Sequence, residues 1–186
     1  MDESMFQIVE GGRYWCALVI RLEDGVDDAL LAAVTAATDL SFEEYGSGGF
    51  GGETLADVWK AGDNLLMEVE CDEVGVKALF VRADTQERAI AIRSTVGEHM
   101  SAWSEQMLRT QLADSYADAP KSLVALLMAT GGARADDETL DLLQRALDHE
   151  DEEVREYAEY AAQVAAELGH PPVVMREAES GEARAE

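Results

Sequence analysis

Residues 54–83, TLADVWKAGDNLLMEVECDEVGVKALFVRA, decide the fold class of this chain. They contain three β-like segments, at 54–60, 64–71 and 76–83, separated by two short turn-like sequences. Apolar and acidic residues alternate in the middle segment, so one face of that strand is apolar and the other is partly acidic. Because connections this short cannot carry a parallel crossover, the stretch predicts an antiparallel meander.

The residues before this meander add a strand and a helix. The β-branched and aromatic residues of Tyr14–Leu22 predict a strand, and its apolar stretch Trp15–Ile20 indicates a central position in the sheet. Gly11-Gly12 would turn a short preceding strand into it. Residues 24–40, DGVDDALLAAVTAATDL, carry apolar side chains at helical spacing and aspartates near their start. This pattern favours an amphipathic helix.

A second helix is predicted after the meander. Its apolar stripe steps by three or four residues and would cover the sheet. The stripe consists of Ala89, Ile92, Val96, Met100, Trp103 and Met107. Asp84 with Glu87 resembles a capping box, and Gly97 marks either a kink or a break between two helices. We therefore expect residues 1–118 to form one α+β domain of order β-α-β-β-β-α.

The rest of the chain has no strand pattern. Three helical stretches follow one another at 121–130, 137–149 and 152–168. We assign residues 119–170 to a helical segment. Residues 171–186 are mostly polar and are expected to form a flexible acidic tail.

Part of this helical segment, LDLLQRALDHEDEEVREYAEYAA at 140–162, resembles a HEAT repeat. The matching positions are Leu142, Leu143, Ala146, Leu147, Asp151, Val154, Arg155, Ala158, Ala161 and Ala162. The resemblance implies a helical hairpin over 137–168, with Asp151 and Arg155 stabilising its turn. HEAT-like units mostly serve protein contacts and stack as about three or more repeats, whereas this chain holds about one. The expected fold is thus α+β, a small antiparallel sheet followed by a HEAT-like α-helical hairpin; residues 1–118 resemble no family.

Charge restricts the classes of partner. The chain has 186 residues, with 39 acidic side chains against 14 Lys and Arg, and its net charge of −25 is spread over both parts. The charge argues against direct binding of nucleic acid or of an anionic membrane, because both need Lys and Arg. A basic protein partner fits best. The alternative is an acid-rich proteome, in which the charge says nothing about a partner.

Cysteine content and the N-terminal residues bear on the compartment. Cys16 and Cys71 both lie in apolar runs, and they are either two structural thiols or one buried bridge. The first residues, MDESMFQIVE, lack the basic region of a signal peptide, and the longest apolar runs are too short to span a membrane. We expect a cytoplasmic protein.

No motif predicts catalysis, a cofactor or a metal site. The glycine-rich residues 45–54, YGSGGFGGET, lack the GK[ST] ending of a phosphate loop and are flanked by glutamates. We expect them to form a flexible contact loop that presents Tyr45 and Phe50. His149–Glu153 begins like a metalloprotease helix, but Glu153 stands where the second His is needed. The sequence therefore favours a non-enzymatic protein without a cofactor.

The strongest binding pattern lies on the last helix. Tyr157 and Tyr160 interleave with glutamates, and tyrosines among carboxylates suit recognition of a basic partner. The candidate partner-binding residues are Tyr45, Phe50, Glu152, Glu153, Glu156, Tyr157, Glu159 and Tyr160. The leading hypothesis is an immunity- or antitoxin-like inhibitor that covers a basic surface of another protein. Alternatives are an acidic adaptor or chaperone, a DNA mimic and an enzyme; the oligomeric state is left open.

Overall fold

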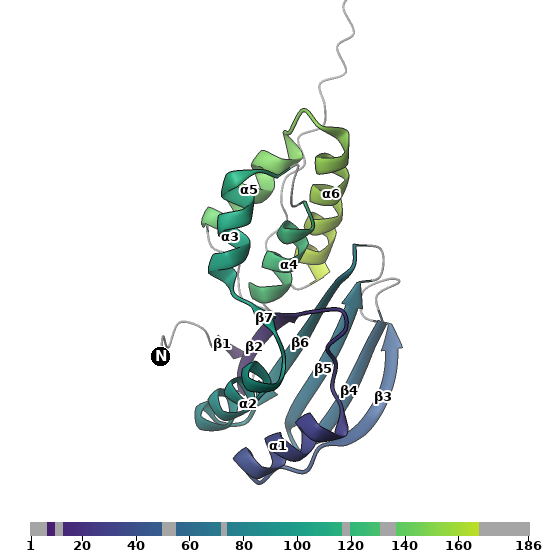
Figure 1. Cartoon of the computed structure of the whole chain (residues 1–186), viewed down its shortest axis with the longest axis vertical. Coiled ribbons are helices and arrows are strands. Elements are labelled where there is room, and N and C mark those ends of the chain that lie inside the picture. Colours follow the sequence, from purple (N-terminus) through teal and green to yellow (C-terminus); the bar gives the residue numbers. More distant parts are fainter. Residues whose placement is uncertain are drawn as a thin grey trace, which may run out of the picture.

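A computed structural model describes residues 7–9, 13–49, 55–71, 74–116, 120–130 and 137–167 of the chain (Figure 1). The strands are β1 (Gln7–Val9), β2 (Arg13–Ile20), β3 (Glu43–Gly49), β4 (Leu55–Ala61), β5 (Asn64–Cys71), β6 (Val76–Ala83) and β7 (Ala102–Trp103). The helices are α1 (Asp28–Thr38), α2 (Gln86–His99), α3 (Glu105–Asp114), α4 (Lys121–Thr130), α5 (Asp137–Leu147) and α6 (Glu152–Glu167). The predicted mixed α+β class is confirmed.

The described strands form one antiparallel sheet. Its order is β1-β2-β6-β5-β4-β3, and β7 pairs with the end of β2. The predicted meander is confirmed, since β4, β5 and β6 are consecutive neighbours joined by short turns. β2 lies beside β6 from Tyr14 to Ile20. On its other side it pairs with β1 at residues 13–15 and with β7 at residues 19–20, so the strand predicted as central has two neighbours at its ends and one in its middle.

Alternate residues of each strand point to opposite faces of the sheet. One face packs against α1 and α2, which occupy the lower part of Figure 1. The buried residues of this layer include Cys16, Leu18, Ile20, Leu30, Val34, Leu66, Leu79, Val81, Ala89, Ile92 and Val96. The helical spacing correctly predicted burial of Leu30 and Val34 in α1 and of the first four positions of the second stripe, Ala89, Ile92, Val96 and Met100. Ala29 and Ala37, which the same spacing assigns to the apolar side of α1, are exposed.

The other face packs against the C-terminal helices, and α4 is the centre of that layer. Its residues 122–128 are all buried, because α4 packs against the sheet as well as against α3 and α6. One apolar cluster extends from Val69, Ala78 and Phe80 of the sheet to α3, α4, α5 and α6. The sheet and the C-terminal helices thus share a core, while the sequence-based boundary at residue 118 stays a prediction.

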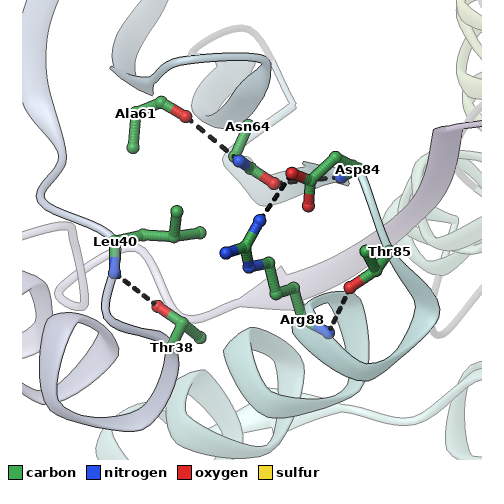
Figure 2. Close-up of polar contacts among 7 residues, drawn as sticks. All are labelled: Thr38, Leu40, Ala61, Asn64, Asp84, Thr85 and Arg88. Carbon is green, nitrogen blue, oxygen red and sulfur yellow. Dashed lines mark hydrogen bonds and ion pairs between the residues drawn. The ribbon is translucent and has the colours of Figure 1, made fainter.

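A small polar cluster fixes the start of α2 (Figure 2). The side chain of Asn64, the first residue of β5, donates to the carbonyl of Ala61 (3.1 Å) and accepts from the backbone N–H of Asp84 (3.0 Å). Thr85 is the N-cap, since its hydroxyl accepts from the N–H of Arg88. Asp84 instead pairs with the Arg88 guanidinium, whose hydrogen bond lowers the pKa of the Asp84 carboxyl. The capping box predicted with Asp84 as N-cap is therefore wrong by one residue.

An ion-pair cluster around the nearly buried side chains of Lys77 and Glu68 holds the connection between β2 and α1. Lys77 of β6 lies 3.2 Å from Glu68 and 3.1 Å from Glu70, both on β5, and donates to the carbonyl of Asp24 (3.2 Å). Glu68 also accepts from the backbone N–H of Val26 (2.7 Å). Burial opposes the charge on Lys77, but the two carboxylates outweigh it and raise the pKa of Lys77. The Lys77 ammonium therefore links strands β5 and β6 to the segment between β2 and α1.

Of the two alternatives left open at Gly97, a kink or a break between two helices, the structure has the break: α2 ends at His99, and β7 follows before α3 begins. Two further expectations about local structure are corrected. Residues 43–49, expected to lie largely in a flexible glycine-rich loop, form the edge strand β3, with a register shift between Glu44 and Gly46. Trp103, expected in the core, lies in β7 and is 39% exposed. Phe50 and the tail at 171–186 lie outside the described residues.

The two cysteines do not form a bridge. Cys16 belongs to the layer with α1 and α2, whereas Cys71 faces α4 and lies 3.9 Å from the sulfur of Met128. The sheet separates the two side chains. The sequence left open either a bridge or two structural thiols, and the structure has two buried free thiols. Burial raises the pKa of Cys16 to about 12, which keeps it protonated and unreactive at neutral pH.

Candidate functional site

The candidate site is a groove of about 750 Å³ at the beginning of α6. Glu152, Glu153, Glu156, Tyr157 and Tyr160 of α6 line it together with Val74, which lies in the turn between β5 and β6. Helical spacing explains the arrangement, since residues three and four apart share one side of a helix. The groove therefore combines one face of α6 with the end of a sheet hairpin.

The turn before α6 sets the position of this face. Arg155 donates from its guanidinium to the carbonyls of His149 and Glu150, each at 2.8 Å. The Asp151 carboxylate accepts from the N–H of Glu153 at 3.0 Å, and the Asp151 carbonyl accepts from the N–H of Arg155. The aspartate and arginine thus stabilise the turn between α5 and α6. Whether this hairpin is a HEAT repeat stays a prediction.

The tyrosines of the groove are anchored and its glutamates are exposed. Tyr157 and Tyr160 are half-buried and pack against the core, so each presents only part of its ring to the groove. Glu152, Glu153 and Glu156 are exposed, and none forms an ion pair within the part of the chain that the structure describes. The groove therefore offers unneutralised carboxylates beside fixed aromatic surface.

The structure places the predicted binding residues in three groups. Five of them line the groove: Glu152, Glu153, Glu156, Tyr157 and Tyr160. Glu159 is exposed on α6 but does not line it. Tyr45 is 69% exposed on the edge strand β3, where the Lys60 ammonium lies 3.1 Å from its ring centroid. Tyr45 thus belongs to a different surface, and Phe50 lies outside the described residues.

Sequence reasoning missed Val74. This residue comes from a turn almost eighty residues before α6, and no local pattern relates the two segments. Val74 is buried in the cluster that also holds Val154 and Ala158 of α6, so packing of the hairpin against the helix closes one wall of the groove. In the sequence, Val74 stands out only as an apolar residue, which predicts burial and not participation in a binding groove.

Nothing in the described part of the chain indicates a metal centre or a membrane span. Within those residues no group of His, Cys, Asp and Glu could hold a metal ion. No helix among them is both long enough and apolar enough to cross a bilayer. Comparison with protein-family models, curated proteins and solved structures found no match.

Proposed function

We propose that this protein is a non-enzymatic, cytoplasmic binding module that acts as an immunity- or antitoxin-like inhibitor by covering a basic surface of a partner protein. The observation that carries the proposal is the groove on α6, where three unpaired carboxylates stand beside two anchored tyrosines. The net charge of −25 supports it, because long-range attraction would speed association with a basic partner.

The groove has the chemistry to receive arginine or lysine side chains. A cation above a tyrosine ring gains from the electrons of the ring face, and nearby carboxylates add charge-assisted hydrogen bonds. Because Tyr157 and Tyr160 are held by the core, their rings lose little conformational freedom on binding. A basic groove of a nuclease-type toxin, which has to bind phosphate, carries the complementary side chains.

The test compares two charge-matched variants of the full chain. The first carries Glu152→Gln, Glu153→Gln and Glu156→Gln in the groove. The control carries Glu87→Gln, Glu98→Gln and Asp141→Asn at exposed positions of α2 and α5. Each variant loses three negative charges, so long-range attraction falls equally and only the groove differs. Both are used to capture proteins from source cells at low and at high salt.

We expect the wild type and the control to retain one basic protein at low salt, and the groove variant to lose it. The retained protein is then assayed for nuclease activity with and without the wild-type chain, which is expected to inhibit it. Equal capture by the two variants would mean that the groove is not the interface. Capture without inhibition would leave a binding module but overturn the inhibitor.

A further inference from the structure

A second groove, distinct from the one on α6, is predominantly apolar. It has a volume of about 420 Å³ and lies where the end of β2, the start of β6, β7 and α4 meet. Its apolar lining consists mainly of Val19, Leu22, Val76, Trp103 and Ala125. The volume is within the range of about 300–1,000 Å³ that is typical of small-molecule pockets.

The apolar surface of this groove is accessible. Leu22 is 47% exposed and Trp103 is 39% exposed, and the described residues include only two other large exposed hydrophobic side chains. Val19, Val76 and Ala125 line the groove and are buried, so they belong to the packed core beneath it. Trp103 stands opposite Val19 in the β2–β7 pair, so its position is set by the sheet. A ligand would therefore meet preformed apolar surface.

Cationic groups occupy the rim. Arg21 lies 3.7 Å from Glu23, and both are largely exposed, so this pair is close to neutral. Lys121 lies at the same edge: a methyl group built on Gly75 would be 3.4 Å from its Nζ and 3.6 Å from Cδ1 of Leu22. Lys121 forms no ion pair or side-chain hydrogen bond within the part of the chain that the structure describes. Among the described residues, the Lys121 ammonium is thus a positive charge at the edge of the groove without an ion-pair partner.

The size of the occupant follows from the charge of the whole chain. An acidic macromolecule would carry many negative charges towards a body of net charge −25, and long-range repulsion would oppose it. A small apolar molecule with a single carboxylate meets little of that repulsion, and its carboxylate is attracted at close range by the Lys121 ammonium. Apolar burial between Leu22, Trp103 and the floor would supply most of the affinity.

We propose that this groove binds a small monocarboxylate with an aliphatic or aromatic body, whose carboxylate pairs with Lys121. The body lies against Leu22 and Trp103 and reaches towards Val19 and Val76. This proposal does not rest on the function proposed for the α6 groove, because the two sites share no lining residue.

The probe is decanoate, titrated into the full chain by calorimetry and by methyl NMR. Two ligands of equal chain length serve as controls: decanol, which has no charge, and decyltrimethylammonium, whose charge is reversed. The test variant is Lys121→Met, which removes the ammonium group and keeps an unbranched side chain shorter by one atom. Its matched control is Lys60→Met, which removes a lysine that lies over Tyr45 on β3.

We expect saturable decanoate binding below about 1 mM, with shifts at the methyls of Val19, Leu22 and Val76. Lys121→Met is expected to weaken decanoate about fivefold, the size of an exposed ion pair, and to leave decanol unchanged. Lys60→Met should match the wild type. The proposal is overturned if decanoate does not saturate, if Lys121→Met binds it as tightly as the wild type, or if decyltrimethylammonium binds the same methyls more tightly.

Discussion

Replacement of Lys77 by Met is expected to destabilise the fold far more than loss of a surface ion pair. The Lys77 side chain is only 9% exposed and Glu68 only 13%, so neither charge is well solvated. Without the ammonium group, Glu68 keeps a single described hydrogen bond, from the N–H of Val26. Removing one partner of a buried pair commonly costs about 3–5 kcal/mol, and the slight exposure of Glu68 places this case near about 3 kcal/mol.

Urea unfolding followed by circular dichroism measures this loss. The comparison variant is Arg88→Met, which breaks the exposed pair with Asp84 and should cost about 0.5 kcal/mol. Adding Glu68→Gln to Lys77→Met should restore part of the stability, because a neutral side chain no longer needs the ammonium while its oxygen still accepts from Val26. A loss from Lys77→Met no larger than that from Arg88→Met would refute the reasoning.

The same variant carries a pH signature. Because the folded state raises the pKa of Lys77, the lysine contributes stability that is fully present below its unfolded pKa of about 10.4. That contribution is lost as the pH rises through the higher folded value. The difference in unfolding free energy between the wild type and Lys77→Met should therefore be constant from pH 7 to 9 and shrink above about pH 10.5. If the difference in unfolding free energy grew above about pH 10.5, the pKa of Lys77 would be lowered by folding and not raised.

Three other expected outcomes test different parts of the fold. Phe80→Ala should cost about 3–5 kcal/mol in urea unfolding, because Phe80 is fully buried beside Trp15 between the sheet and α4. Arg155→Met should lower stability by about 1–3 kcal/mol, since the carbonyls of His149 and Glu150 lose their charged donor; Lys at this position should restore part of it. Neither thiol should react with Ellman's reagent at pH 8 until guanidinium is added, because Cys16 and Cys71 are buried; reaction of either in the native protein would contradict this.

Short-range patterns predicted most of the sheet and its helices. β4, β5 and β6 are joined by turns of a few residues, so pairing and direction followed from local sequence. β3 was missed because its glycines have low strand propensity, and it is a strand through its pairing with β4. Gly46, at φ +145°, occupies the position where the register shifts, a conformation that glycine adopts without strain.

The helix stripe failed where the chain changed its path. Ala89, Ile92 and Val96 are buried as the spacing predicted. Met100 follows directly and is still buried in the same layer, but α2 ends at His99 and the helical phase ends with it. The last two positions of the numerical pattern, Trp103 in β7 and Met107 in α3, are exposed. Periodicity assigns a side chain to a face only while the backbone stays helical. Gly97 indicated a kink or a break, but it lies two residues before the helix ends and does not fix the last helical residue. The apolar groove beside Trp103 was hidden for this reason.

Acidity alone does not separate a partner-binding surface from the surface of a salt-adapted protein, because scattered carboxylates suit both. Several arginines and lysines of the described chain are held locally, as Lys77 is by Glu68 and Glu70. What general acidity does not account for is the setting of Glu152 and Glu156, which line a groove beside two tyrosines held by the core. A proteome-wide acid bias would make neutralisation of any three exposed carboxylates equivalent. If the groove is the binding site, capture of the partner depends on the three carboxylates that line it and not on three carboxylates elsewhere. Comparison with the charge-matched control variant distinguishes the two explanations.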